Sequence, residues 1–154
     1  MRPLKIFIDT EFTSFENLQL ISLGLASENG EEVYFEVEYD KARCSDFVRQ
    51  NVLPLLSNDS TVRFDRATLP LKISEWLQIV KEKNQLIELC HDDDIDWRMF
   101  EVIMNGTPDW IIPRSVFYEL SPLLLEEYYA KNNLPKHHAL YDARANAYAF
   151  REKK

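Results

Sequence analysis

The sequence predicts an α/β fold in a single domain over residues 1–154, with a mixed five-stranded sheet and helices on both faces. Two observations predict it. Three strand-like segments occupy the first forty residues, and helical and strand-like segments then alternate along the remaining chain. Such alternation is typical of a sheet covered by helices on both sides. The sequence contains no internal repeat, low-complexity segment or linker, so we expect one domain.

The first three strands are expected at residues 4–12, 18–27 and 31–40. Asn29-Gly30 is a strong signal for a two-residue hairpin loop between the second and third strands. In the third strand, residues at odd positions are apolar or aromatic, whereas those at even positions are mostly glutamate. Such alternation indicates one buried and one largely acidic face. The chain therefore begins with three antiparallel strands.

The rest of the chain is expected to alternate between helices and strands. Ser45 is a plausible N-cap, as is Thr68, and Ser121-Pro122 has the pattern of an N-cap followed by a first helical residue. The expected elements are a helix from about 45 to 52, a helix from 68 to about 80, a strand over 85–90, a helix through 97–104 that ends at Gly106, a short strand at 110–112, a helix from 121, and a final helix from about 138 to 151.

The composition is that of an ordinary soluble globular protein, with 45% hydrophobic and 29% charged residues. No apolar stretch is long enough for a signal peptide or a membrane span. Cys44 and Cys90 have no metal-like spacing, and we interpret both as buried thiols rather than a disulfide. We therefore expect a cytoplasmic protein.

A formal net charge of −8 argues against a broad basic surface that grips long nucleic acid. It does not exclude an enzyme that binds a short strand end through metal ions. Acidic residues are most crowded at 88–96, where five of nine positions carry a carboxylate.

Two acids stand one residue apart in FIDTEF, at the end of the first expected strand. Alternate side chains of a strand point the same way, so Asp9 and Glu11 would project together. Like charges so placed repel each other unless a cation or water lies between them. Alone, the pair is more often a solvated strand end than a metal site.

Two further patterns change that interpretation. His91 precedes Asp96 by five residues after an expected buried strand, and His137 precedes Asp142 by the same spacing at the start of the final helix. Together with the first pair, they supply four acids and a histidine, each at the end of an expected element. Hard cations such as Mg²⁺ and Mn²⁺ prefer oxygen ligands, and a histidine can accept a proton near neutral pH. The set suits metal-assisted phosphoryl chemistry.

In this order the motifs resemble those of the DEDDh 3′-to-5′ exonucleases, which have a ribonuclease H-like fold. FIDTEF resembles the first motif, HDDDIDWRMF the second and HHALYDARANAYAF the third. The resemblance implies two Mg²⁺ ions, with Mn²⁺ as an alternative. It implies that Asp9, Glu11 and Asp142 hold one ion, that Asp9 and Asp96 serve the other, and that His137 is the general base.

Neighbouring residues compete for these roles. His138 adjoins His137 but lacks the spacing to Asp142. Asp92, Asp93 and Asp94 compete with Asp96, and we interpret Asp92 and Asp94 as solvated or supporting acids. The spacing of Asp92, Asp94 and Asp96 also resembles a calcium loop, but the glycine and glutamate that an EF-hand requires are replaced by Trp97 and Ile103.

Aromatic residues beside the motifs are candidates for stacking terminal bases: Phe12 after the first acid pair, and Trp97 after Asp96. Trp97 also fits the apolar stripe of its helix, so a core position is at least as plausible. The side chain of Thr10 should point away from the acids, whereas the resemblance implies that its backbone approaches the substrate.

The first 40 residues are most similar to the small bacterial and phage exoribonucleases typified by RNase AS, so RNA is the favoured substrate, bound at a single-stranded 3′ end. Released products would be nucleoside 5′-monophosphates, and the relatives are often homodimers. Two alternatives remain: a DNA exonuclease with the same mechanism, and a non-catalytic ribonuclease H-like binding module.

Overall fold

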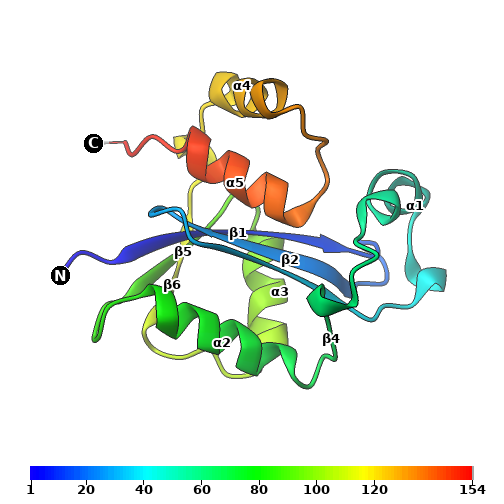
Figure 1. Cartoon of the computed structure of the whole chain (residues 1–154), viewed down its shortest axis with the longest axis horizontal. Helices are drawn as coiled ribbons and strands as arrows, with labels where there is room; N and C mark the ends of the chain where they lie inside the picture. Colours follow the sequence, from blue (N-terminus) through cyan, green and yellow to red (C-terminus); the bar gives the residue numbers. More distant parts are fainter. Residues whose placement is uncertain (154) are drawn as a thin grey trace.

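A computed structural model describes residues 1–153 and shows a six-stranded sheet in the order β4-β3-β2-β1-β5-β6 (Figure 1). The three N-terminal strands are antiparallel, whereas β5 runs parallel to β1, β6 parallel to β5 and β4 parallel to β3. Their bounds are β1 Leu4–Phe12, β2 Leu20–Ser27, β3 Glu32–Val37, β4 Arg63–Phe64, β5 Ile87–His91 and β6 Ile111–Ser115. The five predicted strands are confirmed, and the two-residue β4 is an additional sixth strand at the edge.

Residues 1–153 contain five α-helices: α1 Asp46–Asn51, α2 Leu69–Val80, α3 Asp94–Met104, α4 Pro122–Asn132 and α5 Ala139–Ala149. Figure 1 shows α2 and α3 on one face of the sheet, and α5 with α4 above it on the other. Four short 3₁₀ segments connect these elements: Lys41–Arg43, Leu53–Leu55, Ser60–Val62 and Phe117–Glu119. The predicted α/β class with helices on both faces is confirmed.

The hairpin between β2 and β3 differs from the predicted two-residue loop. The N–H of Gly30 donates to the carbonyl of Ser27 at 3.0 Å, and the N–H of Ser27 donates to the carbonyl of Glu31 at 2.8 Å. Gly30 has a φ of 101°, which favours glycine. The loop is therefore the three-residue kind, in which a glycine at the end supplies a left-handed residue.

The predicted helix starts are confirmed at Ser45 and Ser121, whose side chains accept backbone N–H groups of the first turn. Thr68 occupies the N-cap position of α2, but it makes no side-chain cap, because its hydroxyl donates to the carbonyl of Asp65 at 3.1 Å. β6 runs on through Pro113, which an edge strand tolerates since no further strand needs its missing N–H.

The core lies mainly between the sheet and the α2–α3 layer. Ile6 and Ile8 point into this core, whereas Phe7 packs on the opposite side with Phe150 at the end of α5. The predicted acidic face of β3 is wrong at one position: Glu36 is only 2% exposed. Its carboxylate accepts the hydroxyl of Tyr34 at 2.6 Å and the N–H of Ser57 at 2.7 Å, and these bonds offset its burial.

Both cysteines are buried free thiols, as predicted. Within residues 1–153, no helix combines the length and the apolar character needed to cross a bilayer.

Candidate active site

The site begins at the carboxyl end of β1, where Asp9 and Glu11 lie on the face that α5 covers. Asp9 stands opposite Gly24 of β2 in the antiparallel register. A β-carbon on Gly24 would come within 2.6 Å of the backbone of Leu140, in the first turn of α5. The missing side chain at Gly24 therefore allows α5 to pack directly on the sheet beside the acids.

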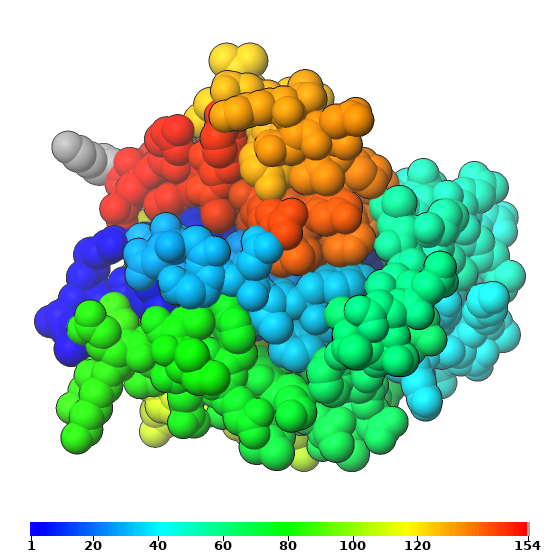
Figure 2. Space-filling view, in the orientation of Figure 1, coloured from blue at the N-terminus to red at the C-terminus, as the bar shows by residue number. Residues whose placement is uncertain are grey.

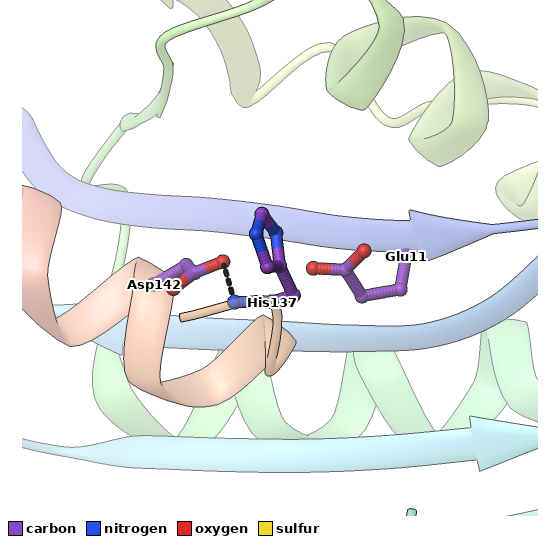
Figure 3. A group of neighbouring side chains, drawn as sticks. All are labelled: Glu11, His137 and Asp142. Carbon is purple, nitrogen blue, oxygen red and sulfur yellow. Dashed lines mark hydrogen bonds between the residues drawn. The ribbon is translucent and has the colours of Figure 1, made fainter. Parts of the chain in front are cut away.

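The start of α5 brings a histidine and a third acid to this position. His137 precedes the helix with a φ of 71°, a left-handed conformation that few non-glycine residues adopt. Its N–H donates to Oδ2 of Asp142 at 3.1 Å (Figure 3). Potential metal-ligating atoms of Glu11, His137 and Asp142 all lie within 4.8 Å of one another. Figure 3 shows the Glu11 carboxylate, from β1, directed toward these two residues of the α5 segment.

A second group of acids lies beside the first. Carboxylate oxygens of Asp9, Asp92 and Asp96 also lie within 4.8 Å of one another. Asp96 belongs to the first turn of α3 and is 2% exposed. Its Oδ1 accepts both the N–H of Thr10 at 3.1 Å and the Thr10 hydroxyl at 2.5 Å. Thr10 therefore fixes the α3 acid against β1.

Burial and mutual repulsion make these carboxylates hard to ionise without a cation. Burial raises the pKa of Glu11 to about 8, with Asp142 and Asp92 adding to the effect. Burial also raises the pKa of Asp9 well above its ordinary value, and Asp96, Asp142, Glu11 and Asp92 all contribute. The Asp9 carboxylate is therefore repelled by acids of both groups, and a positive charge nearby would offset that repulsion.

The two groups open into a cavity of about 220 Å³ between the sheet and α4. Tyr129 of α4 donates its hydroxyl to Oδ1 of Asp142. Lys136 lies with its ammonium 5.6 Å from the centre of the Tyr129 ring and 2.8 Å from the Glu126 carboxylate. The cavity is lined by Asp9, Asp92, Leu125, Glu126, Tyr129, Lys136, His137, Asp142 and Asn146.

A more apolar hollow lies on the other side of Glu11. It is formed by the loop after β1 and by α1, and three phenylalanines line it: Phe12, Phe15 and Phe47. The ring of Phe47 meets the ring of His137 edge to face at 4.9 Å between centres. Figure 2 shows the segment around α1, in cyan and teal, against the beginning of α5, in orange.

The structure separates the predicted substrate-binding residues. Phe12 lines the hollow, whereas Trp97 stacks on Phe100 with ring centres 5.8 Å apart and packs against the main core. Thr10 is buried, and its hydroxyl and N–H are both taken by Asp96. Phe47 replaces Trp97 as the second aromatic side chain near the acids.

The neighbouring histidines have separate surroundings. The ring of His138 is stacked between Tyr34 and Tyr141, with centres 4.5 and 3.9 Å away, and is 9% exposed. Burial, with a smaller contribution from Arg144, lowers the pKa of His138 to about 4. His91 is buried at the end of β5. Among the described residues, only His137 joins either group of potential ligands.

Sequence reasoning gave two residues of the site too little weight or none. Asp92, for which the sequence favours a solvated or supporting role, has a carboxylate oxygen within 4.8 Å of those of Asp9 and Asp96. Its place directly after β5 is a usable signal, because Asp9 and Glu11 also lie toward the end of a strand. Tyr129 had no signal in the sequence, since its contact with Asp142 depends on how α4 packs against α5.

Comparison with known proteins gives one partial match in sequence. The chain is 34% identical over 79 residues to a protein named 3′-5′ exoribonuclease in each of two strains of Mycobacterium tuberculosis. The matched stretch covers 49% of this chain and 47% of the relative, so the chain matches about half the length of these curated relatives. No family model matches the sequence.

Solved structures match over nearly the whole chain. The nuclease domain of 3′hExo, a DEDDh family member bound to rAMP, superposes with a TM-score of 0.62 at 17% identity, covering 95% of this chain and 88% of that one. Cell-death related nuclease 4 gives a TM-score of 0.59 at 14% identity, with 95% and 62% covered. Exonuclease I gives 0.58 at 12%, with 95% and 39% covered. The chain therefore has the ribonuclease H-like fold of DEDDh exonucleases, as its motifs predict.

Proposed function

We propose that this protein is a 3′-to-5′ exoribonuclease that hydrolyses phosphodiester bonds with two divalent metal ions and releases nucleoside 5′-monophosphates. The proposal rests on two groups of acidic side chains that lie next to each other, with Asp9 close enough to be repelled by acids of both. One group contains Glu11, His137 and Asp142, and the other contains Asp92 and Asp96 with Asp9 itself. Elements far apart in the sequence supply these groups, as the three motifs require.

The donor set fits Mg²⁺ or Mn²⁺, because the two groups offer five carboxylates and one imidazole. The raised pKa values of Asp9 and Glu11 support this assignment, because burial and neighbouring acids disfavour uncompensated negative charge there. Asp9, Glu11 and Asp142 would hold one ion, and Asp9 with Asp96 would hold the other, with Asp92 in reach. When bound, a metal pair orients a phosphodiester, activates water and neutralises charge on the leaving oxygen.

His137 is the proposed general base. The hydrogen bond from its backbone N–H to Asp142 fixes the backbone at His137, and the edge contact with Phe47 restricts the orientation of its ring. The imidazole is partly exposed beside the acids, so it can accept the proton of an attacking water and release it to solvent. The buried ring of His138, stacked between two tyrosines, is poorly placed for that exchange.

The hollow between the β1 loop and α1 is the proposed site for the terminal base. Aromatic side chains there can stack on a base of any sequence. Phe15 is 77% exposed and Phe47 is 53% exposed, so both are accessible to a ligand. The choice of RNA rests on the name of the partly matching relatives, 3′-5′ exoribonuclease.

The test is a time course on matched RNA and DNA oligonucleotides labelled at the 5′ end, with Mg²⁺, Mn²⁺ or EDTA, resolved by product length. We expect stepwise shortening of RNA from the 3′ end only with metal. Asp9→Asn serves as the inactive control, because it keeps the shape of the side chain and removes its charge. Faster degradation of DNA than of RNA would show that DNA is the substrate, and no degradation of either would overturn the proposed activity.

We also propose a homodimer working in a reducing compartment such as the cytoplasm. The resemblance to dimeric relatives supports the first part. Exposed apolar side chains at and before the start of α4, Phe117, Tyr118 and Leu123, provide apolar surface for such a contact. The free buried cysteines support the second part. Light scattering during size-exclusion chromatography tests the dimer, and a monomer mass at micromolar concentration would refute it.

A further inference from the structure

Tyr129 makes a contact that the motifs do not predict. It stands on α4, and its hydroxyl reaches across the α4–α5 interface to donate to Oδ1 of Asp142. A phenol is protonated at neutral pH, because its ordinary pKa is about 10, so Tyr129 donates and the carboxylate accepts.

Asp142 is held at both of its oxygens. Tyr129 donates to Oδ1, and the N–H of His137 donates to Oδ2 at 3.1 Å. Two donors from different elements fix the rotation of the carboxylate about its side-chain bonds. Its remaining lone pairs are then available to the group formed with Glu11 and His137. Asp96 has a comparable restraint, because Thr10 donates to it twice.

We propose that Tyr129 is a positioning residue that orients Asp142 for metal binding. The proposal rests on the proposed function, since it assigns a role at the same site. A partner that hydrogen-bonds a metal ligand fixes its orientation, and the loss of such a partner typically costs about 10- to 100-fold in metal affinity or activity. Tyr129→Phe removes the donor and keeps the ring, including its face toward the Lys136 ammonium.

The same pair of helices offers a matched control. Tyr148 of α5 donates its hydroxyl to the carboxylate of Glu127 on α4 at 2.6 Å, at the exposed surface. Here the tyrosine is on α5 and the carboxylate on α4, the opposite of the Tyr129–Asp142 pair. Tyr148→Phe therefore removes a tyrosine–carboxylate bond across the same interface but away from the acids. If Tyr129 only braces α4 against α5, the two variants should behave alike.

The experiment measures Mn²⁺ binding directly by isothermal titration calorimetry, together with thermal unfolding of the metal-free proteins. For Tyr129→Phe we expect Mn²⁺ to bind about 10- to 100-fold more weakly, with little change in the unfolding temperature. Tyr148→Phe should bind Mn²⁺ as the unmodified protein does. In an Asp142→Ala background, which leaves the Tyr129 hydroxyl no side-chain acceptor at residue 142, Tyr129→Phe should weaken the remaining affinity no further.

Each outcome has a separate meaning. Equal Mn²⁺ affinity of Tyr129→Phe and the unmodified protein would overturn the positioning role and leave the proposed nuclease untouched. A loss of affinity that appears equally in Tyr148→Phe, or that is additive with Asp142→Ala, would also overturn it. An unmodified protein that binds no Mn²⁺ would instead refute the two-metal site, before Tyr129 is considered.

Discussion

Gly24 and Leu140 lie so close that a β-carbon on the glycine would meet the α-carbon of the leucine at 2.6 Å. Because Gly24 stands opposite Asp9 in the sheet, this contact sets how near the first turn of α5 comes to the acids of β1. The same turn contains Asp142 and is preceded by His137. One absent side chain therefore controls the distance between two of the three motifs.

Gly24→Ala should accordingly reduce both stability and activity. The added methyl group must push α5 away from β2, and overpacking of this kind costs about 1–3 kcal/mol. Urea denaturation and the turnover number per folded molecule measure the two effects. Gly30→Ala is the control, since it strains a turn with φ of 101° but has open space around it. It should lose stability and keep its turnover number; full activity of Gly24→Ala would contradict the argument.

His137→Ala should lose roughly 10²- to 10⁴-fold in turnover number, the usual contribution of a general base. Added imidazole should restore part of the rate, because it can enter the partly exposed position of the lost ring. His138→Ala should lower the unfolding temperature instead, since that ring fills the space between Tyr34 and Tyr141. A larger loss of turnover number in His138→Ala than in His137→Ala would show that the base is assigned to the wrong histidine.

Phe47→Ala should raise the KM for RNA and leave Mn²⁺ affinity unchanged. Stacking of one base on an aromatic side chain contributes roughly 1–3 kcal/mol, and each 1.4 kcal/mol is about tenfold in affinity. Initial-rate kinetics on single-stranded RNA gives KM and turnover number separately. Leu71→Ala, an exposed leucine on α2 of the opposite layer, is the control. An unchanged KM in Phe47→Ala would remove the hollow from the substrate path.

Sequence patterns predicted most of the fold because strand period and helix-capping residues are local features of the chain. The period of β1 places Asp9 and Glu11 on one face, and Ser121-Pro122 begins α4 as expected. Where tertiary packing decides, the pattern failed. The alternation in β3 predicts that Glu36 is exposed, yet it is buried, and its carboxylate accepts the Ser57 N–H and the Tyr34 hydroxyl. β4 has two residues and no period to detect.

For the site too, local sequence patterns predicted some residues, and tertiary packing decided the others. Motif spacing brought Asp96 and Asp142 into the prediction, and both lie in the two groups. Tyr129 was missed because its role depends on the side of α4 that faces α5, which nothing nearby in the sequence specifies. Trp97 could not be decided from its position alone, because an aromatic residue beside a motif fits a core stripe equally well. The structure places it against Phe100.

The metal-free protein should become less stable as the pH rises. Burial raises the pKa of Glu11 from 4.5 to about 8 in the folded state. Burial and the neighbouring acids raise the pKa of Asp9 in the same direction. Between the unfolded and folded pKa values, the folded protein holds protons that the unfolded chain has released. These two groups therefore lower the free energy of unfolding as pH increases through this window. The lowered pKa of His138 acts in the opposite direction only below its ordinary value of 6.5, so the net fall is expected between pH 6.5 and about 8.

Urea denaturation at a series of pH values, with EDTA present, measures this slope. Glu11→Gln should flatten it, because the amide has no proton to lose at this position. Saturating Mn²⁺ should restore stability most at the alkaline end, where the folded protein would otherwise carry adjacent buried charges. A free energy of unfolding that stays constant from pH 6.5 to about 8 in EDTA would contradict the buried, mutually repelling cluster. A rise over the same range would contradict it more directly.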